Sequence, residues 1–339
     1  MMINNNKTPY PSESLMLQGK TGSSVAVTMI KATFSFSLDG DVEQADYQEP
    51  IFFGDEYWGE PGKTSLRYAS DLVPEKKGTD IALNGHVYSP MNKPSKKINT
   101  VLKVGKISKT VTVWGDRFWQ FSMGMVSMTR PALFTKMPLR YERAFGGEDR
   151  FHEKESKWGV CSENPIGTGF RVTRKKIALD QLKLPNIETY RHPMNNWNDK
   201  PKPGGFGFIA PFWQPRASLC GTFDDAWKNE RMPLLPENFD PGFYNAAPPD
   251  LISTPHLKGN ESVFLKNLHA GSDTVTFNLP GIHFSTSYIF KHQTYKKVPV
   301  LDTLIIEPDE NRFIMVFRSH YDGPEKLSHL IQVNVHEEF

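Results

Sequence analysis

The sequence predicts a mainly β fold of sandwich-like antiparallel sheets, with a long, irregular Pro- and Trp-rich middle segment and one short helix. Apolar and polar residues alternate in several segments near both ends of the chain, and this is the two-residue period of a strand. Aromatic residues make up 12% of the 339 residues, alongside 25 Gly and 26 Pro. This composition is typical of β-rich chains with many ordered connections, not of helical bundles.

The first zone, up to about residue 146, contains the clearest alternation. Every second residue is apolar over residues 30–38, but the apolar positions of residues 25–29 have the opposite parity. Either this strand is buried on both faces at its start, or a bulge near Met29 changes its register. Further extended pieces are expected over residues 81–88, in a hairpin over residues 101–114 that folds about Gly105-Lys106, and over residues 137–145.

The middle zone, residues 146–260, holds 13 of the 26 prolines and four of the seven tryptophans. Disordered segments are poor in aromatic residues, so we expect this zone to be irregular but packed. One short helix is predicted over residues 224–231. Thr222 is the expected N-cap, and Asp224 and Asp225 suit the positive end of the helix dipole.

The last zone returns to strands that are separated by turn signals such as Pro280-Gly281. The expected strands cover residues 263–268, 274–279, 283–290, 298–306 and 313–317. We expect residues 1–260 to form a core of the N-terminal sheet and packed Pro-rich loops. Residues 261–339 are expected to form a C-terminal strand region that packs with this core as one unit.

Charge and composition exclude several classes of function. The 40 basic and 38 acidic residues leave a formal charge of +2, whereas nucleic-acid binding usually demands a strongly basic face. No apolar run approaches the roughly 18–20 residues of a membrane span, and the N-terminus lacks the apolar region of a signal peptide. We therefore expect a cytoplasmic protein without membrane insertion or a nucleic-acid partner.

Known catalytic and metal-binding motifs are missing from the sequence. Cys161 and Cys220 lie 59 positions apart and form no CxxC pair, so a thiolate zinc site is not expected, while a disulfide between them stays open. The sequence has no HExxH, no GxSxG and no phosphate-binding glycine loop. We expect no cofactor, no metal and no catalytic residue.

The 55–72 segment is the most informative part of the chain. It combines Trp, Tyr, Arg and carboxylates around Gly and Pro, as recognition loops do. Its carboxylates, Asp55, Glu56, Glu60 and Asp71, offer the acid and base that glycoside hydrolysis needs. A glycan-active enzyme is therefore one alternative, and a sugar-binding module that uses Trp58 and Trp213 is another. The structural alternative is that the carboxylates pair with Arg67, Arg140 and Arg143.

The 138–147 segment is the second dense motif. If it is extended, Arg143 shares a face with apolar neighbours and needs a partner, because an unpaired buried charge is costly. Our hypothesis is that a carboxylate within residues 55–60 supplies this partner. Gly146 and Gly147 suit a tight turn, since glycine adopts positive φ at little cost.

Several short sequence motifs (phrases), taken together and in order, resemble those of one bacterial family. They begin with the 55–72 and 138–147 segments and continue with Asn164-Pro165-Ile166-Gly167, Leu184-Pro185-Asn186-Ile187-Glu188, Gly205-Phe206-Gly207, Trp213-Gln214-Pro215-Arg216, Gly221-Thr222-Phe223-Asp224, Pro233-Leu234-Leu235-Pro236, Phe239-Asp240 and Phe243-Tyr244-Asn245-Ala246-Ala247-Pro248-Pro249-Asp250. This series is similar to the adaptors, or chaperones, encoded beside type VI secretion effectors, whose shared domain was long labelled as of unknown function. The resemblance spans roughly residues 25–279.

The resemblance implies a non-catalytic cytoplasmic adaptor that binds a cognate type VI effector protein, a toxin. It also implies help in loading that effector onto the spike, which VgrG and PAAR proteins form. The family has no established catalytic residues, and none is carried over. Trp, Tyr and Arg are enriched at the energetic centres of protein interfaces. The candidate residues, either partner-binding or structural within the motifs, are Asp55, Glu56, Tyr57, Trp58, Glu60, Arg67, Tyr68, Asp71, Arg140, Glu142, Arg143, Trp213 and Arg216.

Overall fold

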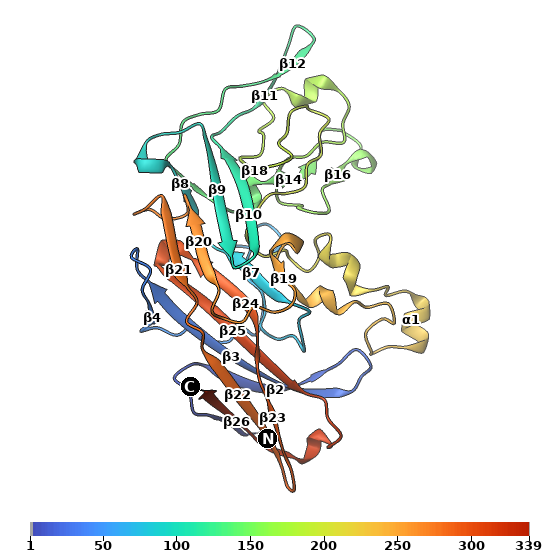
Figure 1. Cartoon of the computed structure of the whole chain (residues 1–339). Coiled ribbons are helices and arrows are strands. Elements are labelled where there is room, and N and C mark those ends of the chain that lie inside the picture. Colours follow the sequence, from blue (N-terminus) through green and yellow to red (C-terminus); the bar gives the residue numbers. More distant parts are fainter. Residues whose placement is uncertain (1–2, 339) are drawn as a thin grey trace.

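A seven-stranded sheet forms the centre of the molecule in the computed structural model, which describes residues 3–338 (Figure 1). Its strands follow the order β19-β7-β24-β25-β3-β2, with β4 pairing beside β3, and all pairs are antiparallel except β24 with β7. Strands from both sides of residue 260 therefore belong to one sheet. The bounds are β2 (Ser12–Gln18), β3 (Ser24–Phe36), β4 (Val42–Gln44), β7 (Thr79–Leu83), β19 (Ile252–Ser253), β24 (Val300–Glu307) and β25 (Arg312–Tyr321).

Strand β3 is buried on both faces. Every residue from 26 to 34 is buried, and the pairing of β3 with β2 and with β25 runs without a register shift. The first of our two alternatives for this strand is thus confirmed, and the predicted bulge near Met29 is wrong. A central strand covered on both sides has no solvent face, so its apolar residues need not alternate.

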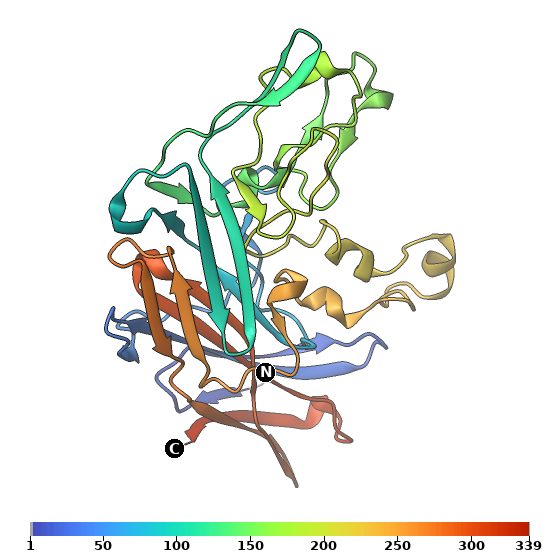
Figure 2. The same ribbon diagram turned by 45° about the horizontal axis from the view of Figure 1, so that its top comes forward.

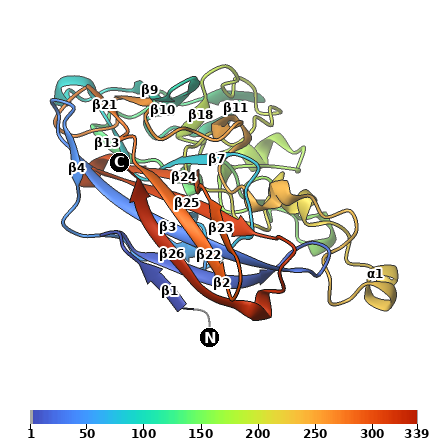
Figure 3. The same cartoon turned by 60° about the horizontal axis from the view of Figure 1, so that its bottom comes forward.

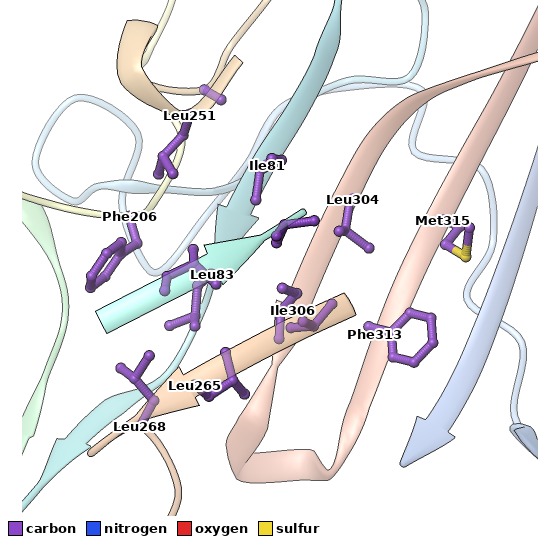
Figure 4. Packing of buried hydrophobic residues seen from close by; sticks show 14 of the residues in the cluster. Ile81, Leu83, Phe206, Leu251, Leu265, Leu268, Leu304, Ile306, Phe313 and Met315 are labelled. Atoms are coloured by element: carbon purple, nitrogen blue, oxygen red, sulfur yellow. The ribbon is translucent and has the colours of Figure 1, made fainter. Parts of the chain in front are cut away.

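A five-stranded sheet packs against one face of the central sheet and forms the main core. Its order is β18-β10-β9-β20-β21, with bounds β9 (Lys97–Val104), β10 (Ile107–Trp114), β18 (Ile187–Thr189), β20 (Ser262–Lys266) and β21 (Thr274–Asn278). The predicted hairpin about Gly105-Lys106 is confirmed as β9–β10. Figure 4 shows the side chains that gather between the sheets, with Leu304 and Phe313 among them.

Stacked phenylalanines join these two sheets. Phe277 of β21 lies 4.5 Å from Phe36 and 5.2 Å from Phe313, measured between ring centroids. Phe313 in turn stacks on Phe34 at 5.5 Å. Aromatic pairs of this kind bury much area and add stability beyond it.

A four-stranded sheet with both chain ends lies beside the central sheet (Figure 3). Its order is β1-β26-β22-β23, with bounds β1 (Ile3–Asn6), β22 (His283–Phe290), β23 (Thr294–Lys297) and β26 (Leu330–Glu338). Phe284 packs edge-on to Phe317 of β25 at 4.9 Å. Of these strands only β22 was among the predictions. The signal for β26 was present but missed, because Ile331, Val333 and Val335 alternate with polar residues.

The remaining elements are short. Two-stranded pairs are formed by β5 (Glu56–Tyr57) with β6 (Leu66–Tyr68), β8 (His86–Tyr88) with β13 (Lys136–Pro138), β11 (Trp119–Ser122) with β12 (Met125–Met128), β14 (Phe145–Gly146) with β17 (Thr168–Gly169), and β15 (Glu148–Asp149) with β16 (Gly159–Val160). Single 3-10 turns are η1 (Pro90–Asn92), η2 (Tyr141–Arg143), η3 (Glu155–Lys157), η4 (Lys176–Leu179), η5 (Arg216–Cys220), η6 (Pro241–Tyr244), η7 (Pro249–Leu251), η8 (Pro308–Glu310) and η9 (Leu327–His329).

The predicted fold class is confirmed: the chain is mainly β, has several antiparallel sheets, and contains the single α-helix α1 (Asp225–Glu230) among its described residues. Figure 2 shows α1 projecting to one side of the sheets. Within residues 3–338, no helix is long and apolar enough to cross a membrane.

Three local predictions need correction. The N-cap of α1 is Asp224, which accepts from the Trp227 amide, and not Thr222. The expected strand over residues 81–88 is split, because β7 ends at Leu83 and β8 begins only at His86. Residues 137–145 are not extended throughout, since η2 interrupts them.

Replacing Phe313 by Ala should lower the free energy of unfolding by about 3–5 kcal/mol, because it leaves a cavity between stacked rings. Phe53→Ala is the matched control, since Phe53 is 55% exposed, and it should change stability by less than about 1 kcal/mol. Urea unfolding followed by circular dichroism measures both. Equal midpoints for the two variants would contradict this account of the core.

Candidate binding surface

The 55–72 segment lies over the face of the central sheet that is opposite the main core. Phe52, Leu66 and Tyr68 form an apolar cluster with Ile305 of β24 and Ile314 of β25. Tyr68 stacks on Phe52 at 4.5 Å. Tyr57 packs against the same cluster. Apolar contact therefore holds the aromatic residues of this irregular segment on the sheet.

A buried ion pair fixes the end of the segment. The Lys31 ammonium lies 2.8 Å from the Asp71 carboxylate, with side chains 0% and 5% exposed. The ammonium also lies 3.2 Å from the centroid of the Phe52 ring, and the Phe52 amide donates to Asp71. Burial lowers the pKa of Lys31, while Asp71 opposes this shift. Asp71 is therefore a structural anchor.

Two further ion pairs continue across the same face. Arg318 pairs with Asp302 and donates to the carbonyl oxygens of Val73 (2.7 Å) and Asp71 (2.8 Å). Burial acts to raise the pKa of Asp302, but Arg318 and Lys76 hold that pKa below its ordinary value. We call these pairs, together with Lys31–Asp71 and Lys76–Asp80, the buried ionic row.

Lys76 and Asp80 attach a second irregular segment, around Asn245 and Ala246, to the central sheet. The Lys76 ammonium lies 2.8 Å from Asp80 and donates to the Thr303 hydroxyl at 2.6 Å. Asp80 accepts from the Ala246 amide at 2.9 Å and from the Asn245 side chain at 3.0 Å. One carboxylate thus fixes parts of the chain that are 165 positions apart.

The other carboxylates of the segment do not make the arginine pairs that we expected. Asp55 accepts from the Ser70 amide at 2.9 Å. Glu60 forms an exposed pair with Lys63 at 2.9 Å, and Glu56 is exposed. The hypothesis of pairing with Arg67, Arg140 and Arg143 is wrong for these residues, because Asp55 and Glu60 have other partners and Glu56 forms no ion pair within residues 3–338.

The 55–72 and 138–147 segments meet at a surface made by Trp58, Arg67 and Arg140, which we call the Trp58 platform. The guanidinium carbons of Arg140 and Arg67 lie 4.0 Å and 4.7 Å from the centroid of the Trp58 ring. Arg67 approaches Glu310 at 3.8 Å, whereas Arg140 has no ion pair within residues 3–338. Glu142 holds the two segments together by accepting from the Ser65 amide (3.0 Å) and hydroxyl (2.7 Å).

Arg143 does not contact residues 55–60, so that hypothesis is wrong. It donates to the Asn186 side chain at 3.2 Å and lies 4.0 Å from Asp116. The reason is η2, which turns Arg143 away from the direction that a continuous strand would give it.

Trp213 and Arg216 are buried. Trp213 is 1% exposed and packs edge-on to Tyr141, with centroids 5.6 Å apart. Arg216 donates to the carbonyl oxygens of Phe243 (2.8 Å) and Ile209 (2.9 Å). Trp213 leaves no free ring face for a sugar, so its proposed part in a sugar-binding module is wrong.

The positive φ expected at Gly146 and Gly147 is confirmed, at +152° and +97°, but the predicted tight turn is wrong, because Gly146 ends β14 and Gly147 links it directly to β15. A Cβ on Gly146 would lie 2.2 Å from the carbonyl oxygen of Asn164. Asn164 is fully buried and donates to the carbonyl oxygens of Tyr141 (2.8 Å) and Phe145 (3.0 Å). Close backbone approach, together with positive φ, is the reason for glycine here.

A hollow of about 310 Å³ lies where several of the motif phrases converge. Tyr141, Pro215, Pro248 and Pro249 form much of its wall, and Lys109 and Asp250 pair at 2.8 Å beside it. Burial lowers the pKa of Lys109, and Asp250 opposes the shift. The sequence reasoning missed Lys109, which stands in an ordinary strand pattern.

Sequence reasoning also missed most of the buried ionic row. A signal was present: Lys31 is the one charged residue within residues 25–36, and Arg318 directly follows the apolar run of residues 313–317. A charge within a strand that is buried on both faces requires a partner.

Within residues 3–338 no group of three His, Cys, Asp or Glu side chains could hold a metal ion. Cys161 and Cys220 are both free thiols, so no disulfide joins them.

These features define a mainly β protein with long irregular segments fastened to its central sheet. Residues 21–318 match the family model described as "Uncharacterized protein conserved in bacteria (DUF2169)", and the chain belongs to this family. Comparison with curated proteins and with solved structures gave no match.

Lys31→Met should lower the free energy of unfolding by about 3–5 kcal/mol, because Asp71 is left as a buried, unpaired charge. Lys63→Met is the control: its pair with Glu60 is 72% and 64% exposed, and exposed pairs contribute about 1 kcal/mol or less. Denaturant unfolding measures both variants. A double variant, Lys31→Met with Asp71→Asn, should recover part of the loss; no recovery would contradict the ion-pair explanation.

Proposed function

We propose that this protein is a non-catalytic adaptor that binds a cognate type VI secretion effector and helps to load it onto the VgrG or PAAR spike. The ordered phrases that resemble such adaptors support this proposal, and they lie within the residues that match the family model. The compartment in which an adaptor would meet its effector is the bacterial cytoplasm.

The Trp58 platform is the observation that carries the proposal. Trp and Arg are the residues most enriched among interface hot spots. Arg140 keeps donors that no acidic side chain of residues 3–338 engages. An effector would supply carboxylates or carbonyl oxygens to this guanidinium and apolar surface to the indole.

Rigidity of the platform suits it to binding. Glu142 fixes Ser65, and the Lys31–Asp71 pair fixes the end of the same segment. A surface that is already ordered loses less conformational entropy on association. The adaptor would then stabilise its effector by mass action, as any ligand of a folded state does, without a chemical step.

Arg140→Ala should weaken binding of the effector by at least about tenfold, as expected for an interface hot spot. The test is co-expression with the protein encoded next to this chain, followed by co-purification, light scattering and titration calorimetry. Arg150→Ala is the matched control, because Arg150 also lies over an indole, Trp158, at 5.1 Å, but on another part of the molecule. Arg150→Ala should leave affinity unchanged.

Circular dichroism must show that both variants keep the wild-type fold. A stable complex of defined stoichiometry that Arg140→Ala alone weakens would support the proposal. A neighbouring protein that is soluble alone and never associates would contradict the adaptor function. A complex that tolerates Arg140→Ala would contradict only the role of the platform.

A further inference from the structure

Residues 169–174 and 197–200 lie at the end of the molecule that is remote from both termini (Figure 1). Together they line a small polar pocket. It encloses about 180 Å³ and is lined by Gly169, Arg171, Val172, Thr173, Arg174, Trp197, Asn198, Asp199 and Lys200. Pockets for drug-sized molecules and cofactors measure about 300–1,000 Å³. This one therefore suits a small polar group.

Three cations line the pocket: Arg171, Arg174 and Lys200. The Arg171 Nε is buried without a hydrogen-bond partner. Within residues 3–338, Arg174 and Lys200 take part in no hydrogen bond or ion pair; the Lys200 ammonium lies 5.4 Å from the centroid of the Phe170 ring. Two of the three cations, Arg174 and Lys200, therefore line the hollow without a partner among the described residues, and they come from two separate segments of the chain.

The carboxylates close to the pocket are already used by backbone amides. Asp149 is 1% exposed and accepts from the amides of Phe151 (3.1 Å), Val172 (2.9 Å) and Thr173 (2.8 Å). Burial acts to raise the pKa of Asp149, but these amides hold that pKa below its ordinary value. Asp149 lies 3.9 Å from one terminal nitrogen of Arg171 and leaves its Nε free.

Asp199 is engaged in the same way. It accepts from the amides of Asn195 (2.9 Å) and Asn196 (2.7 Å), which shapes the loop that carries Trp197 and Lys200. The two carboxylates, Asp149 and Asp199, therefore hold the loops that line the pocket. With three cations and two carboxylates, the pocket has a net charge of +1.

We propose that this pocket binds a phosphate group. A carboxylate is planar and one guanidinium can satisfy its two oxygens, whereas a tetrahedral phosphate accepts hydrogen bonds from several directions and carries more charge. Cations from two separate segments, at residues 171–174 and at Lys200, together with the lining residue Asn198, match the phosphate. The group would come either from free phosphate or from a small phosphomonoester.

Titration calorimetry of the full chain with inorganic phosphate, phosphoserine and acetate tests this proposal. We expect saturable 1:1 binding of phosphate or phosphoserine with Kd of about 0.1–1 mM, and at least about tenfold weaker binding of acetate. A clear preference for inorganic phosphate would identify free phosphate as the ligand. A preference for phosphoserine would identify the phosphomonoester.

Arg174→Gln and Lys200→Gln should each weaken phosphate binding by at least about tenfold, since each removes a charge-assisted contact. Both side chains are exposed enough for the fold to tolerate the change. Lys175→Gln is the matched control, because it removes the same charge next to Arg174 but does not line the pocket. Absence of saturable binding up to about 10 mM, acetate binding as tight as phosphate, or an equal loss in Lys175→Gln would each overturn the proposal.

Discussion

The buried ionic row is the constraint on which the rest of the structure depends. The central sheet must be covered on both faces, because β3 and β25 bury nearly all of their residues. One face is covered by the five-stranded and four-stranded sheets, but the other is covered by largely irregular segments that contain only short strands such as β5 and β6. Buried Lys31, Arg318 and Lys76 each require a partner. Lys31 and Arg318 of the sheet bind Asp71 and the carbonyl oxygens of Val73 and Asp71 in the irregular segments, whereas Lys76 of an irregular segment binds Asp80 of the sheet. The segments that cover this face of the sheet therefore also neutralise its buried charges.

In the irregular parts of the chain, single polar side chains make the hydrogen bonds between segments that backbone groups make within a sheet. Asn164, Asp149 and Glu142 each accept from or donate to backbone groups of a distant segment. A buried polar group that is fully hydrogen-bonded rigidifies its surroundings, whereas a partly satisfied one is costly. The irregular middle of the chain therefore stays ordered although it contains few strands and a single α-helix within the described residues. Its glycines permit the close backbone approaches that these bonds require.

The two surfaces that we propose for binding share one property. At the Trp58 platform and at the phosphate pocket, nearby carboxylates are committed to backbone amides or hydroxyls, so arginines remain with unused donors. Such cations can bind an external anion, and no ion pair within the protein has to break first. The platform combines a partly exposed indole with two guanidinium groups and suits a protein, whereas the pocket is small and polar and suits a single group.

The sequence alone determined the mainly β fold class, the β9–β10 hairpin and the positions of the dense motifs, because period-two alternation and turn residues act over short distances. It also predicted the positive φ of Gly146 and Gly147. It could not determine which charges meet. Arg143 reaches Asn186 instead of residues 55–60, and Asp71 reaches Lys31, because one 3-10 turn and the order of strands set these directions. Whether Trp213 is a surface or a core residue was likewise decided only when residues far apart in the chain packed around it, since burial is a property of the assembled fold and not of a local pattern.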